Sequence, residues 1–310
     1  MTFAFGGVCG RIGLLVVASA LVACGEDSFA SPDIGFVDAP PPRSLHDMQL
    51  AFASNRGGSY DVYSIRADGT DLRQLTNDPD DQLSPTWSAD GKQILFVAAT
   101  VSGSSLIALD VASGVETPVK SDLSAVDFGS FSPDGTRIAV AGHGAAAGSD
   151  GIFTLDASGA SQTSFGIVGS GGGHSPLWAG DNRVYYTSTA GGVADISSIG
   201  ADGTKPQQIT HGIGLIGHAD VSRSARKVAY ATVTGSQGTV ATFDRVLGIT
   251  TTFPTLDDFE PAISPDDRYV AVTTRRFGNP EIVILDITDG TLVQRITDSA
   301  SLDGLAAFAP

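Results

Sequence analysis

A phrase that the chain repeats several times constrains its fold more than any other feature. The clearest copies occupy residues 81–96, 131–140 and 260–272, and weaker copies occupy residues 176–186 and 219–230. Their anchor residues are Trp87, Phe131, Trp178, Val221 and Ile263, which lie 42 to 47 positions apart. A repeat of this length accommodates four short strands, which is the size of a propeller blade, and is too long for leucine-rich or ankyrin repeats.

A second phrase lies in the other half of each unit. Residues 61–76, 195–210 and 281–297 each combine a β-branched run, an Asp-Gly pair and a final Leu-Thr or Ile-Thr. These features predict a third strand, a tight turn and an outer fourth strand. Asp-Gly or similar pairs also follow the anchors, where we expect type I′ turns between the first and second strands. Those pairs are Asp90-Gly91, Asp134-Gly135, Asp181-Asn182 and Asp266-Asp267.

The two ends of the repeat region complete one unit between them. Residues 50–56 resemble a second strand with no first strand before it, and residues 302–310 resemble a first strand with nothing after it. Phe308 lies 45 positions beyond Ile263, in phase with the other anchors. A ring closed by strands from both termini leaves no free sheet edge. We therefore predict an all-β fold over residues 48–310, a six-bladed β-propeller whose first blade is closed by strands from both termini.

The repeated phrase resembles the WD40-like repeat, or PD40 repeat, of TolB-like propellers and of the propellers of prolyl-oligopeptidase-type peptidases. The resemblance rests on Pro85, Trp87, Asp90-Gly91 and the later Asp-Gly-Thr and Leu-Thr pairs, and it covers residues 48–310. It implies an envelope protein that binds a peptidoglycan-associated lipoprotein or a similar partner through the channel mouth. The chain contains no Gly-x-Ser-x-Gly elbow, so the peptidase catalytic residues have no counterparts in it.

The first 24 residues resemble a bacterial lipoprotein signal peptide. Arg11 precedes the apolar run Ile12–Ala20, and Leu-Val-Ala-Cys24 follows it. A run this short indicates export rather than a membrane span. We expect cleavage before Cys24 and lipidation of its thiol, the alternative being an ordinary signal peptide with an unmodified cysteine. Residues 25–47, rich in Asp, Pro and Ser, are predicted to be a disordered tether. The expected location is the cell envelope, anchored by lipid and facing the periplasm from the outer membrane.

Composition excludes some functions. The chain carries 34 acidic and 18 basic side chains, a net charge of −16, which disfavours nucleic acid and direct contact with an anionic lipid surface. Its two cysteines, Cys9 and Cys24, both lie in the leader region, so no disulfide is expected in the propeller. We expect a monomer.

Acidic residues and histidines collect where the innermost strands are predicted to begin. Propeller geometry would bring these positions to one mouth of the central channel, which makes them a candidate binding site for a partner, a small ligand or a cation. The alternative is that the carboxylates cap backbone N–H groups and the histidines are solvated. The candidate residues are Asp81, Asp127, His174, His218, Asp258, Glu260 and Asp303.

The sequence therefore favours a non-enzymatic interaction scaffold whose partners are envelope proteins or peptidoglycan-associated components. We assign no catalytic residue and expect no cofactor. The alternatives are a metal-assisted polysaccharide lyase or hydrolase built on a propeller, for which a divalent cation would occupy the channel mouth, and a small-ligand or cation-binding module at the same mouth.

Overall fold

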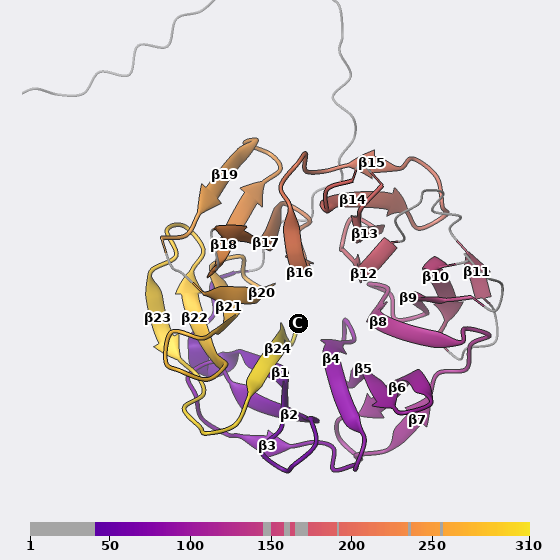
Figure 1. Ribbon diagram of the computed structural model, residues 1–310, viewed down its shortest axis with the longest axis horizontal. Coiled ribbons are helices and arrows are strands. Elements are labelled where there is room, and N and C mark those ends of the chain that lie inside the picture. The colour runs from indigo at the N-terminus through magenta and orange to yellow at the C-terminus, as the bar shows by residue number, and fades with distance from the viewer. Residues whose placement is uncertain are drawn as a thin grey trace, which may run out of the picture. The chain divides into compact units, whose positions relative to one another are not determined.

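The computed structural model is a ring of six four-stranded antiparallel sheets, the blades of a β-propeller (Figure 1). It describes residues 41–144, 150–157, 162–164, 173–190, 192–234, 237–254 and 257–310. The predicted leader, Cys24 and most of the predicted tether lie outside the described residues. No helix among the described residues is long and apolar enough to cross a membrane.

Each blade is written here from the innermost strand outward. Blade 1 comprises β24 (Asp303–Phe308), β1 (Gln49–Ser54), β2 (Asp61–Arg66) and β3 (Arg73–Gln74), and blade 2 comprises β4 (Asp81–Trp87), β5 (Gln93–Thr100), β6 (Gly103–Asp110) and β7 (Glu116–Pro118). Blade 3 comprises β8 (Ala125–Phe131), β9 (Arg137–His143), β10 (Asp150–Asp156) and β11 (Gln162–Ser164), and blade 4 comprises β12 (Gly173–Trp178), β13 (Arg183–Ser188), β14 (Asp195–Gly200) and β15 (Gln207–Gln208). Blade 5 comprises β16 (Leu215–Val221), β17 (Lys227–Thr234), β18 (Gln237–Asp244) and β19 (Ile249–Thr252), and blade 6 comprises β20 (Asp258–Ile263), β21 (Tyr269–Thr274), β22 (Glu281–Asp286) and β23 (Leu292–Arg295).

The last strand of the chain closes the ring. β24 pairs antiparallel with β1, and Leu50 lies opposite Phe308. Figure 1 shows this C-terminal strand inside blade 1, beside the strands from the start of the described chain. The predicted six-bladed propeller, closed in blade 1 by strands from both termini, is confirmed.

Repeated polar residues form the turns between first and second strands. Ser88 donates its hydroxyl to Asp90 at 2.8 Å, and the equivalent pairs Ser132–Asp134 and Ser264–Asp266 lie at 2.6 and 2.7 Å. Only the second residue of each predicted pair has a positive φ, for example 70° at Gly91, whereas a type I′ turn requires two such residues. The turns are therefore where the sequence places them, but they are not type I′: the amide of Gly91 bonds the carbonyl of Ser88 and a left-handed residue completes the loop.

The threonine of the second repeated phrase holds the outer strand to the third. The Thr76 hydroxyl accepts the amide hydrogen of Val62 at 2.9 Å. Thr210 and Thr297 accept equivalent bonds in blades 4 and 6 at 2.8 and 2.9 Å. The recurrence of these residues is explained by sheet structure.

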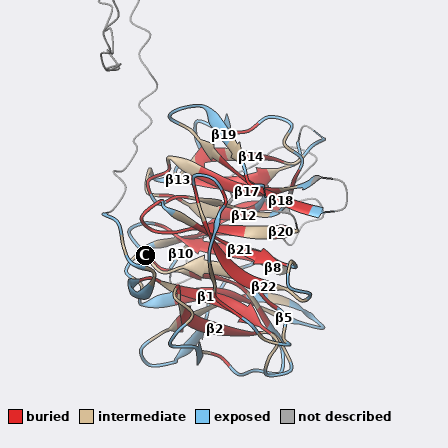
Figure 2. Cartoon of the chain, turned by 90° about the vertical axis from the view of Figure 1, so that its left-hand side faces the viewer, coloured by how far each residue is buried: buried red, intermediate tan, exposed pale blue. Residues whose placement is uncertain are grey.

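The hydrophobic core is divided among the interfaces between blades. Six clusters of buried side chains each join two neighbouring sheets, such as Leu50 and Phe52 of blade 1 with Ile282 and Ile284 of blade 6. Figure 2 shows the buried residues concentrated in the stacked sheets and the exposed ones in the connecting loops. The alternating apolar residues of each blade thus bury both faces of its sheet.

The last residues of the predicted tether form part of the folded unit. Leu45–Asp47 form a short 3₁₀ helix, η1, and Leu45 packs on the cluster between blades 6 and 1. The Arg43 amide donates to Asp266 at 3.0 Å, and the Arg43 guanidinium donates to a main-chain oxygen of Pro310 at 3.0 Å. The chain therefore joins the propeller beside the end of its last strand.

Candidate functional site

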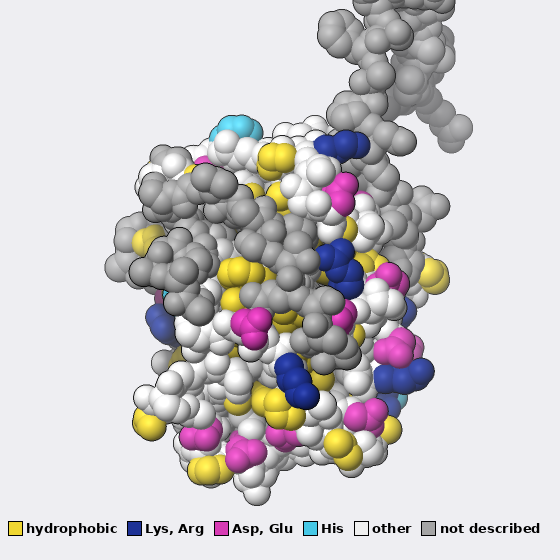
Figure 3. Space-filling view, turned by 90° about the vertical axis from the view of Figure 1, so that its right-hand side faces the viewer, with side chains coloured by type: hydrophobic (Ala, Val, Ile, Leu, Met, Phe, Trp, Pro, Cys, Tyr) yellow, Lys and Arg dark blue, Asp and Glu magenta, His cyan; other side chains and the backbone are white. Residues whose placement is uncertain are grey.

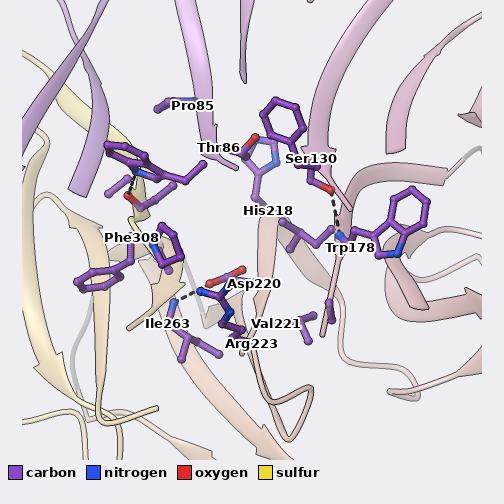
Figure 4. A pocket seen from close by; sticks show the side chains of 18 of the residues that line it. Pro85, Thr86, Ser130, Trp178, His218, Asp220, Val221, Arg223, Ile263 and Phe308 are labelled. Atoms are coloured by element: carbon purple, nitrogen blue, oxygen red, sulfur yellow. Dashed lines mark hydrogen bonds between the residues drawn. The ribbon is translucent and has the colours of Figure 1, made fainter. Parts of the chain in front are cut away.

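A cavity of about 220 Å³ lies at the centre of the ring and receives residues from all six innermost strands. It occupies the C-terminal half of those strands and the turns that follow them. Figure 4 shows lining residues that converge from separate blades. The rim is formed by the turn and terminal residues Ser88, Ala89, Pro133, Gly180, Arg223, Pro265, Ala309 and Pro310.

A β-bulge interrupts the pairing of every innermost strand with its neighbour. At Ser84, Ser175, Glu260 and Leu305 the bulge residue has a φ between 50° and 54°. Proline follows the first three of these residues, and it can do so because the inner edge of an innermost strand has no ladder partner that needs its N–H. Bulges redirect side chains, so they vary what each blade presents to the channel.

The cavity walls are largely apolar. Aromatic residues Trp87, Phe128, Phe131, Trp178 and Phe308 contribute to them, together with prolines and alanines. Apolar walls with a few converging polar groups are typical of ligand pockets.

Three polar residues immediately before the anchors link neighbouring blades. The Thr86 hydroxyl donates to the Gly129 carbonyl at 2.7 Å, and the Ser130 hydroxyl accepts the Trp178 amide at 2.9 Å. In blade 5 this position holds Asp220, whose carboxylate accepts the Ile263 amide at 2.6 Å. The dashed lines of Figure 4 mark the links made by Ser130 and Asp220.

Asp220 therefore brings an ionisable group to a place where other blades have neutral ones. Burial raises the pKa of its carboxyl to about 6, against the opposing effect of the Ile263 and Val221 amides, and Asp267 raises the pKa slightly further. Asp220 is therefore mostly ionised at neutral pH and becomes protonated as the pH falls through about 6, so its charge responds to pH and to a charged group entering the cavity.

His218 and Glu260 are the two predicted site residues that line the cavity. His218 lies 2.6 Å from the Ser175 hydroxyl through Nδ1, and its ring centroid lies 5.2 Å from that of Phe128. Burial lowers the pKa of His218, partly offset by the negative charge of Glu260. Glu260 accepts hydrogen bonds from the Thr273 hydroxyl at 2.8 Å and the Leu305 amide at 3.0 Å.

Three of the predicted carboxylates lie close enough to Tyr60, near the N-terminal ends of the innermost strands, to affect the pKa of its hydroxyl. Burial, and then the charges of Asp81, Glu260 and Asp303, raise the pKa of Tyr60. Asp81 is exposed there and accepts the Tyr60 amide at 3.0 Å. The structure thus gathers part of the predicted set at this end of the channel, with Glu260 reaching the cavity.

Two predicted site residues are instead buried in ion pairs. Asp258 and Asp303 are both 0% exposed, and each accepts two bonds from an arginine, Arg276 and Arg56 respectively, at 2.9 to 3.1 Å. They therefore lie inside the sheet ends and not on loops open to a ligand, because each faces an arginine two residues beyond the second strand of its blade.

The remaining two predicted residues stand apart from the cavity. Asp127 pairs with His143 at 3.6 Å across two strands of blade 3, and His174 is exposed. Within the described part of the chain, no group of three or more His, Cys, Asp or Glu side chains is arranged to hold a metal ion.

Sequence reasoning missed Asp220 and Arg223. A signal for the first was present: the residues before the six anchors are Thr86, Ser130, Leu177, Asp220, Ala262 and Ala307, and only one is charged. Arg223 lies in a turn, where charged residues are common, so its sequence position carries no equivalent signal.

Comparison with known proteins identifies the class of this propeller. The PD40 family, the TolB beta propeller domain, matches residues 43–253. The chain belongs to this family.

Relatives of known name point to the same group. A Protein TolB homolog from Chlorobium luteolum is 29% identical over 248 residues, which is 80% of this chain and 36% of that protein. The Tol-Pal system protein TolB from Nitratidesulfovibrio vulgaris is 44% identical over 48 residues, 15% of this chain and 11% of that one. The matches thus span well under half the length of these relatives.

Solved structures share the fold. TolB from Acinetobacter baumannii has a TM-score of 0.74 at 21% identity, covering 86% of this chain and 68% of that one. An oligogalacturonate lyase in complex with manganese has a TM-score of 0.51 at 14% identity, covering 76% of this chain and 84% of that one. At these identities the likeness concerns architecture alone.

Proposed function

We propose that this protein is a non-enzymatic binding scaffold of the bacterial cell envelope, which holds a segment of a partner protein in its central channel. The observation that carries the proposal is the cavity itself, about 220 Å³ in volume, lined by all six innermost strands and bordered by apolar walls. Proteins use such clefts to bury side chains of a partner or a small ligand.

The charges near the cavity favour a segment that carries a basic residue. Glu260 and Asp220 face the cavity, and Asp81 adds charge at the far end of the channel. On the flank shown in Figure 3, acidic and basic side chains are interspersed. A Lys or Arg of the partner would therefore be attracted by the acidic groups of the channel. Association of the partner with the propeller should weaken as the salt concentration rises.

The TolB relatives support a place in the envelope, and one of them is named for the Tol-Pal system. The partner that we propose is a peptidoglycan-associated lipoprotein or a similar envelope component. The lipoprotein-like leader ending at Cys24 favours anchoring to the outer membrane, facing the periplasm.

Affinity capture from detergent-solubilised envelopes tests this proposal. Glu260→Gln removes a cavity charge with little change in shape, and Glu116→Gln on the outer strand β7 is the matched control. We expect the Glu260 variant to recover several-fold less partner, while the control recovers as much as the wild type. Equal recovery by both variants, with unchanged melting temperatures, would show that the channel is not part of the surface that binds the partner.

A further inference from the structure

Arg223 spans the mouth of the cavity. It belongs to the turn after β16 in blade 5, and its guanidinium donates to the carbonyl of Ala89 at 3.1 Å. Ala89 lies in the turn after β4 in blade 2, which is separated from blade 5 by two blades in either direction around the ring (Figure 1). The side chain therefore links turns on opposite sides of the rim of the cavity that it lines.

A second arginine lies at the same rim. Arg43 donates to a main-chain oxygen of the last residue, Pro310, which lines the cavity and lies close to Gly91 in the turn that carries Ala89. Burial, and then the positive charge of Arg43, lower the pKa of Arg223. The two guanidinium groups are thus near enough to repel one another.

Arg223 has no acidic partner among the described residues. Its guanidinium donates only to the backbone carbonyl of Ala89, although the chain has 34 acidic and 18 basic side chains, whereas the guanidinium of Arg43 is engaged by a main-chain oxygen of the last residue, Pro310. By contrast, Arg56 and Arg276 each bind a buried carboxylate through two hydrogen bonds. A guanidinium has five N–H donors in a planar fork, so Arg223 keeps donors free for an incoming group.

We infer that Arg223, beside Arg43, forms a carboxylate-binding site at the rim of the cavity, and that the segment held in the channel places a carboxylate there. This inference rests on the proposed function and specifies its partner. The carboxylate, from an acidic side chain or a chain terminus, replaces the Ala89 carbonyl as the acceptor for Arg223. The negative charge thereby relieves the repulsion between the two arginines. Loss of the bond between Arg223 and Ala89 opens the mouth of the cavity, and apolar parts of the segment then enter the cavity.

The chain carries its own reporter for this site. It contains two tryptophans, Trp87 and Trp178, and both line the cavity. Intrinsic fluorescence therefore responds to occupancy of the cavity without a label. A suitable pair of probes is N-acetyl-L-phenylalanine and N-acetyl-L-phenylalanine amide, which share an aromatic group and differ in the charge of the carboxyl end.

The test is a titration of each probe into the wild type, Arg223→Gln and the control Arg73→Gln on the outer strand β3. Because charge-assisted bonds to a carboxylate are strong, the acid should bind the wild type and the control about tenfold more tightly than the amide. Arg223→Gln should erase this preference without a change in melting temperature, since Arg223 is an exposed turn residue.

Three results would overturn the inference: equal affinities for the two probes in the wild type, a preference for the acid that survives in Arg223→Gln, or no saturable response to either probe. Capture of an envelope partner is measured separately and does not use these probes. Equal affinities together with partner capture that depends on Glu260 would reject the carboxylate site and leave the scaffold proposal standing.

Discussion

Arg56 holds both carboxylate oxygens of Asp303, at 2.9 Å each, although the two residues lie 247 positions apart in the chain. Asp303 begins the C-terminal strand and is fully buried, and Arg56 follows the first described strand. Their pairing joins the two termini of the ring at its seam. Asp258 and Arg276 form the equivalent pair one blade earlier, so the same buried ion pair occurs in two neighbouring blades.

Removal of Arg56 should destabilise the propeller strongly. Arg56→Ala leaves the buried carboxylate of Asp303 unpaired, which typically costs about 3–5 kcal/mol of unfolding free energy. The exposed pair of Arg73 and Asp71 is the control, and Arg73→Ala should cost less than about 1 kcal/mol. Urea denaturation measures both. Similar small effects for the two variants would show that the seam does not depend on this pair.

Loss of the last strand should open the ring. Deletion of residues 301–310 removes β24, so β1 becomes an unpaired inner edge and part of the core between blades 6 and 1 is exposed. We expect a lower melting temperature, measured by calorimetry, and association into oligomers, measured by light scattering. A deletion variant that stays monomeric and melts with the parent would refute closure by the C-terminus.

The architecture could be predicted because each blade repeats the same order of strands and turns, with similar residues at equivalent positions. Phe308 stands in phase with Trp87 and Trp178, so the seam was visible in the spacing alone. The turn geometry was less accessible, because an Asp-Gly pair is compatible with several turns and the bond from the Ser88 hydroxyl to Asp90 selects the observed one.

The site was harder to predict than the fold. Proximity to a propeller axis can be inferred from a repeat, and the structure places two of the candidate residues, His218 and Glu260, in the lining of the central cavity. Burial and pairing depend on neighbouring strands, so the partners of Asp258 and Asp303 were not visible in the sequence. The span of Arg223 across the rim depends on the ring diameter and on a rotamer, which no periodic pattern encodes.

Asp220 should make stability depend on pH. Its folded pKa of about 6 exceeds the ordinary value of 3.8, so the folded protein binds this proton more tightly than the unfolded chain does. The resulting stability is complete below about pH 4 and is lost as the pH rises through 6. Relative to Asp220→Asn, the wild type should therefore lose unfolding free energy between pH 4 and pH 7. Parallel stability curves for the two proteins over this range would contradict the shift.

Cys24 is predicted to be the site of lipid attachment, on the basis of the Leu-Val-Ala-Cys sequence after the apolar run. Cys24→Ser should move the protein from the membrane fraction to the soluble periplasmic fraction, because the thiol that carries the lipid is absent. Fractionation followed by immunoblotting reads this out. Continued membrane fractionation of the variant would exclude lipidation at this residue as the anchor.

Site-specific photo-cross-linking in living cells tests most directly whether the channel holds a partner. Pro133 is an exposed residue on the cavity rim, and Val115 is an exposed residue in the turn between β6 and β7 on the outside of the ring. p-Benzoylphenylalanine at position 133 should yield a discrete adduct with one envelope protein, and the same group at position 115 should not. An adduct from position 115 alone, or none from position 133 in cells that express the protein at its normal level, would contradict the account.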